Sequence, residues 1–341
     1  MTRVLFICKQ RPSRYGASYG LLNSCRFLCN ALRSMGVESI IVEVVDNNSI
    51  DREIHKYRPT HVFIEALWVV PAKFEELIPL HPKVQWHVRL HSNIPFIANE
   101  GMAVDWIIKY NKLQKKYPQF NISPNSIRMV NDLKRSLNIP TIYSPNIYQP
   151  HSSVDEFFHQ TPIDRNPHVL DFGCFGAIRP LKNQLIQAMA AMAFANELNK
   201  TLYFHVNHSR IENNGENTYK NLVALFQGSK HKIVEHDWVI HEDFMKLIRK
   251  MDIGLQVSFS ETFNIVAADF VHLKIPIVGS KEIEWMNPLY QAKTTDLDSI
   301  VSHLWLAWIG RKIGLHSVNN CGLEEYNEGA RKVWKKLLKL Q

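Results

Sequence analysis

Disulfide and zinc frameworks are the first features that the sequence lacks. It has five cysteines, which is an odd count, in a long chain of 341 residues. Cys25 and Cys29 are four residues apart, and no second pair of ligands lies near them in the sequence. We therefore expect free, buried thiols in a reducing compartment, and neither a disulfide network nor a metal site.

Long apolar segments are also missing. No uninterrupted apolar run reaches the roughly 18 residues that a membrane-spanning helix needs. The apolar run at residues 4–8 has the length of a buried strand and is too short for the core of a signal peptide. We therefore expect a cytoplasmic protein without a transmembrane segment.

The composition is that of an ordinary globular protein, and the chain is long enough for two domains. Hydrophobic residues make up 45% of the chain and charged residues 21%, and two domains of about 150 residues each would account for the length. The formal net charge is +8. A basic surplus favours anionic partners, such as nucleotide phosphates, nucleic acid or acidic lipid, without choosing among them.

Predicted strands and helices alternate along the whole chain. Strands are predicted in the first half at residues 4–8, 39–45, 61–64, 83–90, 106–109, 126–129 and 141–143, and in the second half at 168–174, 201–206, 232–235, 253–257 and 276–278. Helices are predicted at 185–198 and 219–226, and apolar residues at helical spacing follow the first strand. This alternation is typical of parallel sheets with helices on both faces.

Prolines at positions 145, 150, 162 and 167 predict a linker, and we expect the boundary between two domains near residues 150–167. We expect two Rossmann-like α/β domains with doubly wound parallel sheets that face a cleft. Residues 1–150 would form an N-terminal, acceptor-side domain, joined by a basic C-terminal helix at 324–341. Residues 168–323 would form a C-terminal, donor-side domain.

The segment at residues 173–184 follows a predicted strand and opens a predicted helix. Gly176 allows a ligand to approach the backbone closely. Arg179 can bind two phosphate oxygens, and Lys182 adds a mobile positive charge beside a helix N-terminus. These residues suit a diphosphate, and a solvated turn with two surface cations is the alternative interpretation.

A second segment, at residues 258–269, also lies between a predicted strand and a predicted helix. Glu261 in the loop can accept hydrogen bonds from sugar hydroxyls, whereas a carboxylate is a poor ligand for phosphate. The backbone N–H groups of Phe263, Asn264 and Ile265 would lie at the helix start, where they are available to phosphate oxygens.

Together the two segments resemble the large retaining glycosyltransferase family of the GT-B fold that includes sucrose synthase and bacterial glycogen synthase. That family carries a Gly-x-x-Arg-x-x-Lys-Gly segment, which stands here at 176–183, and a Glu-x7-Glu motif, which runs here from Glu261 to Asp269. The sequence departs from the family in having Asp269 for the second glutamate and Asn264 for the usual glycine. Order and spacing agree over residues 169–279, about a third of the chain.

The resemblance implies catalytic roles for four residues. Arg179 and Lys182, beside Gly176, would hold the donor diphosphate. Glu261 would contact the hydroxyls of the donor sugar. His91, at the end of the predicted strand 83–90, would lie beside that sugar, and a structural histidine is the alternative.

The resemblance also implies a nucleotide site. The N–H groups of Phe263, Asn264 and Ile265 would bind its phosphate. Asp269 would bind the ribose. Trp238 and Val239 would lie where the family binds the base of the donor nucleotide.

A loop with three cations and two tyrosines follows the first strand and faces the expected cleft. Its candidate acceptor-side residues are Lys9, Arg11, Arg14, Tyr15, Gly16 and Tyr19. Cations beside stackable rings suit an anionic acceptor such as nucleic acid, and the donor phosphates are the alternative ligand. The loop has no Gly-x-Gly-x-x-Gly pattern, which argues against a dinucleotide site.

Two further motifs have structural interpretations. Asp296-Leu297-Asp298 spells the metal-binding string of the other major glycosyltransferase fold, but it precedes an apolar helix, where aspartate is a favoured N-cap. The helix that follows carries Trp305 and Trp308. We interpret it as a buried stripe, with peripheral contact to a membrane as the alternative.

We therefore expect a glycosyltransferase that acts with retention, as the resemblance implies, without a metal or a prosthetic group. Its co-substrate would be a UDP-, GDP- or other nucleoside-diphosphate sugar. The acceptor is open, and a hydroxylated base in DNA is one specific anionic case. The alternatives are a nucleotide-sugar epimerase or hydrolase of the same fold and a non-catalytic nucleic-acid-binding protein.

Overall fold

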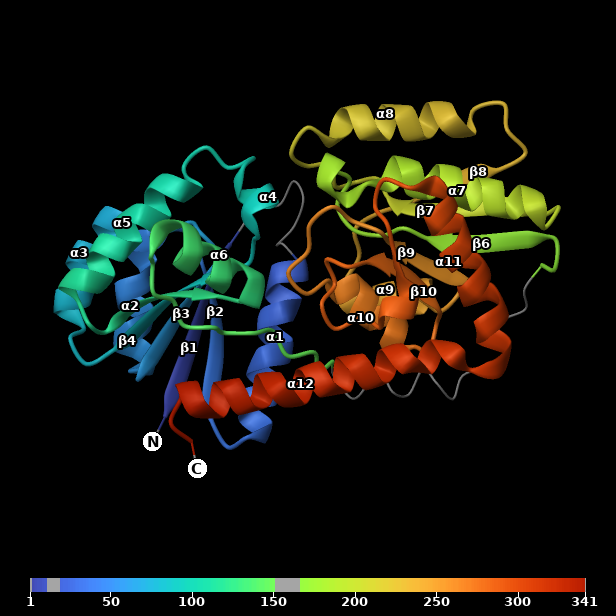
Figure 1. Cartoon of the computed structure of the whole chain (residues 1–341). Helices are drawn as coiled ribbons and strands as arrows, with labels where there is room; N and C mark the ends of the chain where they lie inside the picture. The colour runs from blue at the N-terminus through green and yellow to red at the C-terminus, as the bar shows by residue number, and fades with distance from the viewer. Residues whose placement is uncertain (1, 11–18, 151–165, 341) are drawn as a thin grey trace. The chain divides into compact units, whose positions relative to one another are not determined.

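The chain divides into two compact units (Figure 1). The structure, a computed structural model, describes residues 2–10, 19–150 and 166–340. Unit 1 comprises Met1–Gln149 and Asn327–Gln341, and unit 2 comprises Pro150–Tyr326. The last helix, α12 (Val318–Leu337), begins in unit 2 and ends in unit 1.

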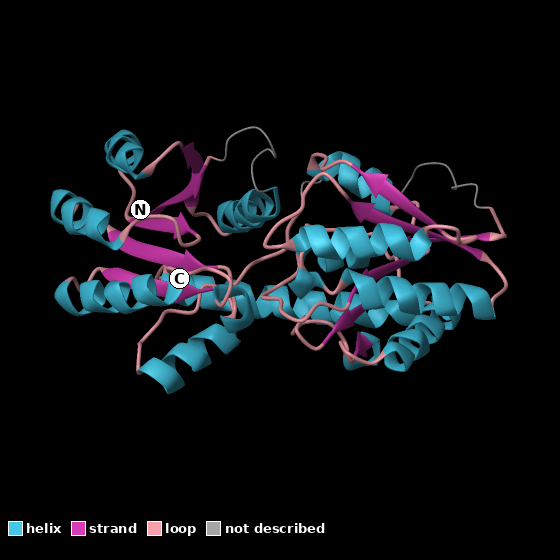
Figure 2. Ribbon diagram, turned by 90° about the horizontal axis from the view of Figure 1, so that it is seen from above, coloured by secondary structure: helices cyan, strands magenta, loops and turns pink. Residues whose placement is uncertain are grey.

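Unit 1 is built on a five-stranded parallel sheet (Figure 2). In spatial order its strands are β2 (Glu38–Val44), β1 (Arg3–Lys9), β3 (His61–Glu65), β4 (Gln85–Leu90) and β5 (Phe120–Pro124). Its helices are α1 (Tyr19–Ser34), α2 (Ile50–Tyr57), α3 (Pro71–Leu80), α4 (Ile94–Ile97), α5 (Ala103–Lys116) and α6 (Ile127–Leu137). The chain adds β2 on one side of β1 and then β3 to β5 on the other, so the winding reverses between β1 and β3.

Unit 2 repeats this plan with six parallel strands. In spatial order they are β11 (Gln291–Ala292), β10 (Ile277–Ser280), β9 (Ile253–Gln256), β6 (Val169–Gly173), β7 (Thr201–Asn207) and β8 (Lys232–His236). Its helices are the single turn η3 (Pro180–Lys182), α7 (Gln184–Glu197), α8 (Gly215–Phe226), α9 (His241–Ile248), α10 (Ile265–His272) and α11 (Leu297–Gly310). Here the winding reverses between β6 and β9. The prediction of two doubly wound parallel sheets is confirmed.

Three predicted strands are wrong. Residues 106–109 lie within α5, residues 126–129 lie at the start of α6, and residues 141–143 form no regular element. The buried positions Ile107, Tyr110 and Leu113 explain the first error. They recur every three or four residues, which is helical spacing, and a four-residue window shows only one turn of that pattern.

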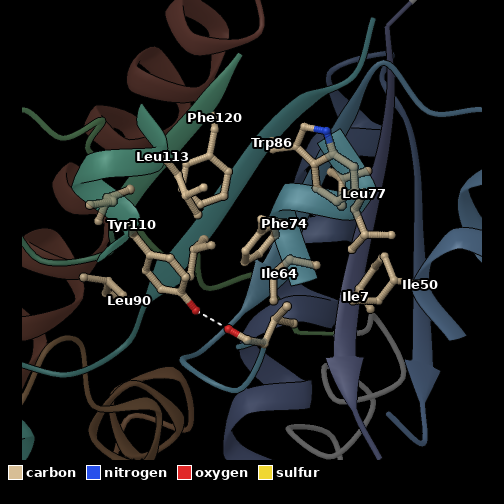
Figure 3. Packing of buried hydrophobic residues seen from close by; sticks show 14 of the residues in the cluster. Ile7, Ile50, Ile64, Phe74, Leu77, Trp86, Leu90, Tyr110, Leu113 and Phe120 are labelled. Carbon is tan, nitrogen blue, oxygen red and sulfur yellow. Dashed lines mark hydrogen bonds between the residues drawn. The ribbon is translucent and has the colours of Figure 1, made fainter. Parts of the chain in front are cut away.

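The core of unit 1 packs around an aromatic cluster (Figure 3). The ring of Phe74 on α3 contacts Trp86, Tyr110 and Phe120 edge to face, with centroid distances of 4.8 to 6.0 Å. The hydroxyl of the buried Tyr110 donates a hydrogen bond to the backbone oxygen of Val69. These contacts join α3 and α5 to one face of the sheet, at the strands that carry Trp86 and Phe120.

Helix α11 packs on α7 with its apolar stripe. Asp296 caps it, because its Oδ1 accepts a hydrogen bond from the backbone N–H of Ser299 at 3.0 Å, so the interpretation of this aspartate as an N-cap is confirmed. Phe194 on α7 contacts the rings of Trp305 and Trp308, with centroid distances of 5.0 and 6.2 Å.

Among the described residues, no helix combines the length and hydropathy that crossing a bilayer requires.

The cysteines are free thiols. Those that are buried are Cys8, Cys25, Cys29 and Cys174. The expectation of buried thiols is confirmed for these four and is wrong for Cys321, which lies on an exposed face of α12.

The last turns of α12 complete the core of unit 1. Trp334 is fully buried, and its ring contacts Phe63 at a centroid distance of 5.0 Å and Phe6 at 6.3 Å. Its indole N–H donates a hydrogen bond to the backbone oxygen of Pro145 at 2.9 Å. The chain end is therefore part of the first unit's core rather than an appendage.

We expect Trp334→Ala to lower the free energy of unfolding by about 3–5 kcal/mol, because it leaves a cavity beside Phe6 and Phe63. Urea unfolding followed by circular dichroism measures the change. Lys335→Ala changes the exposed neighbour on the same helix and serves as the control. Equal unfolding midpoints for the two variants would show that α12 does not stabilise unit 1.

Two histidines on neighbouring strands of unit 1 are held neutral. His87 is buried, its ring stacks on Phe63 at 4.3 Å, and its Nδ1 lies 2.9 Å from Ser123 Oγ. Burial lowers the pKa of His87 to about 3. Burial, with a smaller effect from Lys339, lowers the pKa of His61 to about 4. Neither imidazole accepts a proton in the folded state at neutral pH.

These depressed pKa values predict a loss of stability in acid. Above the unfolded-state pKa of about 6.5 neither state is protonated, and below it only the unfolded chain binds the proton. The contribution of His87 should therefore fall by about 1.4 kcal/mol per pH unit as the pH drops from about 6 towards 4. Urea unfolding at several pH values should give a shallower dependence for His87→Gln, and an unchanged one for the exposed control His168→Gln.

Candidate functional site

The candidate site of unit 2 centres on an ion pair. Lys182 Nζ lies 2.6 Å from Glu261 Oε1, and the two side chains are 11% and 9% exposed. Lys182 belongs to η3, after β6, and Glu261 belongs to the loop after β9. Because β6 and β9 are adjacent parallel strands, both residues follow carboxyl ends at the point where the winding of the sheet reverses. Ligands of doubly wound sheets bind at such points.

A left-handed glycine shapes the first of these loops. Gly176 has a φ of +114°, and a Cβ there would lie 3.7 Å from the side chain of Lys182. Its N–H donates a hydrogen bond to Asn207 Oδ1 at 3.0 Å, which ties the loop to the end of β7. Glycine is favoured at such a φ because a side chain would be strained. The turn then directs Lys182 back towards Glu261.

Arg179 lies in the same loop and faces a second carboxylate. Its Nη1 is 3.5 Å from Glu212 Oε2. Glu212 also accepts a hydrogen bond from Arg210 Nε at 2.7 Å. Both predicted phosphate-binding cations therefore have carboxylate partners within unit 2, and these partners orient their charged groups.

The predicted base-binding residues lie in the loop between β8 and α9. Trp238 and Val239 are half-buried. The guanidinium of Arg210 lies 4.5 Å from the centre of the Trp238 ring, and the backbone N–H of Trp238 donates to Ser209 Oγ at 2.8 Å. Arg210 thus connects Trp238 to Glu212, and through it to the position of Arg179.

Helix α10 begins at the second motif. Its N-cap, Asn264, has a φ of +63°, and its Oδ1 accepts a hydrogen bond from Ala267 N at 2.9 Å. Its side-chain amide donates to Gln256 Oε1 at 2.9 Å. Asparagine tolerates left-handed backbone better than other residues with a side chain, and it also caps a helix. This explains how asparagine can occupy the position where the resembled family has glycine.

Two other residues of this motif lie beside the cap. Phe263 is buried, and its backbone oxygen accepts a hydrogen bond from Trp285 Nε1 at 2.7 Å. Ile265 is the first residue of α10, where the helix itself provides no acceptor for the N–H group.

Asp269 lies on the second turn of α10 and is almost fully buried. Its Oδ1 is 2.8 Å from His241 Nε2, at the start of α9. The structure thus places the carboxylate against an imidazole within unit 2. The ribose contact that the family resemblance implies for Asp269 stays a prediction.

In unit 1, His91 belongs to a buried polar network. His91 Nε2 lies 2.6 Å from Glu65 Oε2, and Arg89 Nη1 lies 3.1 Å from the same oxygen. The other ring nitrogen of His91 lies 3.3 Å from Asn125 Nδ2. Arg89 also donates to the backbone oxygen of Ser144 at 3.0 Å. Both ring nitrogens of His91 therefore have protein partners.

Burial and charge act against each other in this network. Burial tends to raise the pKa of Glu65, but the charge of Arg89 and the interaction with His91 outweigh it and lower that pKa. Burial lowers the pKa of His91, and Glu65 offsets only part of this effect. The network therefore favours an Arg89–Glu65 ion pair beside a neutral imidazole.

A pocket opens next to this network, with a cavity volume of about 110 Å³. It lies at the carboxyl ends of β1, β3 and β4, where the winding of the first sheet reverses. Its polar lining residues are Lys9, Glu65, Trp68, His91, Ser92 and Glu100. Of the predicted acceptor-side residues, only Lys9 is placed here. Arg11, Arg14, Tyr15, Gly16 and the side chain of Tyr19 lie outside the described residues.

Comparisons with solved structures match the whole chain. The trehalose-6-phosphate synthase OtsA is 11% identical, with 99% of each chain covered and a TM-score of 0.71. Sucrose-phosphate synthase from Thermosynechococcus elongatus is 12% identical, with 99% of this chain and 98% of that chain covered and a TM-score of 0.67. The chain has the GT-B fold. No family model matches the sequence, and no curated protein matches it.

Sequence reasoning missed several residues of the candidate site in unit 2. Arg210 and Glu212 follow β7, and His241 opens α9, yet all three contact predicted site residues. The same holds in unit 1 for Glu65, which ends β3 and contacts His91. Their signal in the sequence is position alone, since Glu65 ends its strand and Arg210 and Glu212 follow theirs closely.

The cap of α10 can be tested directly. Asn264→Ala should lower the free energy of unfolding by about 1–2 kcal/mol, because alanine loses the cap and is strained at this φ. Asn264→Gly should cost clearly less, because glycine relieves the strain. Thermal unfolding measures both variants, and an alanine variant as stable as the glycine variant would contradict this account.

Proposed function

We propose that the protein is a glycosyltransferase that moves a sugar from a nucleoside-diphosphate sugar to an acceptor hydroxyl. The observation that carries the proposal is the Lys182–Glu261 pair, with Arg179 in the same loop as Lys182, at the reversal point of the second sheet. The GT-B structures that match the chain include trehalose-phosphate and sucrose-phosphate synthases, which supports this reaction class. Retention and independence from metal follow from the family resemblance.

The cations and the start of α10 would bind the donor diphosphate. Arg179 and Lys182 are each held near a carboxylate within unit 2. A diphosphate carries more negative charge than one carboxylate, so it would compete for both cations. The N–H groups of Phe263, Asn264 and Ile265 would add neutral donors from the helix start.

The nucleoside would lie along the Trp238 loop. Arg210 supports the Trp238 ring from one face. The neighbouring backbone of Val239 would contact the base. His241 Nε2 lies 2.8 Å from Asp269 Oδ1, and the carboxylate of Asp269 would accept hydrogen bonds from the ribose. This assignment rests on the resemblance for its ligand and on these contacts for its support.

The transfer would break the bond between the anomeric carbon and the diphosphate and form a bond from that carbon to the acceptor oxygen. The acceptor's proton would pass to the leaving phosphate oxygen. Arg179, Lys182 and the α10 N–H groups would stabilise the negative charge that develops there, because they are oriented before the reaction begins. Glu261 would hold the sugar hydroxyls, and His91 would lie beside the sugar.

For the acceptor, the pocket of unit 1 favours a small hydroxylated molecule. Its volume of about 110 Å³ and its lining of Ser92, Trp68, Glu100 and Lys9 suit hydrogen bonds to hydroxyl groups. A polynucleotide finds no specific support in this lining, so a modified DNA base is the weaker candidate.

Donor binding tests the proposal. We expect one of the UDP-, GDP-, ADP- or dTDP-sugars to raise the melting temperature of the protein. Lys182→Ala and Arg179→Ala should each weaken the binding of that donor by roughly tenfold to a hundredfold, since each removes a charge-assisted contact. Lys220→Ala, an exposed lysine on α8, is the matched control.

Turnover gives the second readout of the same experiment. Both variants should lose sugar transfer, while Lys220→Ala should keep it. If Lys182→Ala and Arg179→Ala bind the donor as tightly as the unmodified chain, the diphosphate assignment is wrong. Release of free sugar at an equal rate with and without acceptor would instead favour a hydrolase.

A further inference from the structure

Unit 1 contains a polar cluster that the proposed reaction does not use. Asp51, His55 and His81 each offer a ligand atom, and these atoms lie within 4.8 Å of one another. Asp51 Oδ1 is 2.7 Å from His81 Nε2 and 3.3 Å from His55 Nδ1. The two imidazole rings meet edge to face with a centroid distance of 5.0 Å.

Local structure brings the three side chains together. Asp51 and His55 are four residues apart on α2, so both point from the same helical face. His81 is the C-cap of α3, and its backbone is held on both sides. Its N–H donates to the oxygen of Leu77 at 3.1 Å, and its oxygen accepts from Val84 N at 3.1 Å. The cluster therefore links two helices that are separated in the sequence.

A simple ion pair accounts for only two members of the cluster. Asp51 and His81 alone could form a hydrogen-bonded surface pair, which typically contributes less than about 1 kcal/mol. The third member, His55, adds a second imidazole, whose Nδ1 lies 3.3 Å from Asp51 Oδ1 and 3.1 Å from the backbone oxygen of Asp51. If both imidazoles were charged they would repel each other, whereas two neutral imidazoles and one carboxylate can share one cation.

The donor set matches a divalent transition metal. Imidazole nitrogen and carboxylate oxygen are ligands of Zn²⁺, at about 2.0–2.2 Å from the metal. Tetrahedral geometry at that radius puts the ligand atoms roughly 3.3–3.6 Å apart, inside the range of separations in this cluster. His81 has a 9% exposed side chain and His55 a 69% exposed one, so one side of the cluster is open to water.

We propose that Asp51, His55 and His81 form a binding site for a divalent transition-metal ion of the Zn²⁺ class, which joins α2 to the end of α3. Solvent completes the coordination shell on the exposed side. The site is independent of the glycosyl transfer proposed above, because none of its residues belongs to the candidate donor or acceptor sites. Bound metal stabilises the folded chain, because the unfolded chain does not hold the three ligands together.

The experiment is a calorimetric titration of the full chain with Zn²⁺, after removal of any affinity tag and treatment with a chelator. We expect one equivalent to bind and the melting temperature to rise. His55→Gln should weaken binding by at least about tenfold and remove most of that rise. The exposed side chain of His55 makes this variant the one least disturbing to the fold, and circular dichroism checks it.

Three further variants locate the bound ion. His168→Gln removes another exposed histidine, and Cys321→Ser removes the exposed thiol, so neither should change the affinity. Asp51→Asn should weaken binding as His55→Gln does. The proposal is overturned if no equivalent of Zn²⁺ binds saturably, if His55→Gln binds as the unmodified chain does, or if only Cys321→Ser loses the ion.

Discussion

Parallel strand pairing is the constraint on which both candidate sites depend. In each sheet every strand runs in the same direction, so all carboxyl ends meet at one edge, and the reversal of winding separates two adjacent loops there. In unit 1 that point lies between β1 and β3, where Lys9 and Glu65 line the pocket. In unit 2 it lies between β6 and β9, whose loops supply Lys182 and Glu261.

Buried charge marks both of these points, and it is costly. Glu65 and Arg89 are fully buried, and such a pair stabilises a fold only when its hydrogen bonds are well satisfied. Here Ser144 and His91 supply further partners, so the charges are compensated without solvent. Polar networks of this kind, next to a pocket at a sheet reversal, are more typical of functional sites than of stability alone.

Low identity and similar fold occur together in this protein. The two solved structures compared above share 11% and 12% of residues with this chain, yet they cover nearly all of it with TM-scores of 0.71 and 0.67. A fold constrains which positions are apolar more than which residues fill them, and the reaction depends on a few side chains. The proposal of glycosyl transfer therefore rests on Lys182, Glu261 and Arg179 as much as on the architecture.

The sequence by itself determined the architecture and the two motifs of the candidate site in unit 2, because both are local patterns. Continuous apolar runs mark strands buried on both faces. Gly176, Arg179 and Lys182 lie within seven consecutive residues. Part of helix α5 was predicted as a strand, because a four-residue window is too short to show helical spacing. Only the tertiary structure decided the partners, such as Glu212 for Arg179 and His81 for Asp51. These pairs are 30 or more residues apart, so the packing of separate loops and helices, not local pattern, brings them into contact.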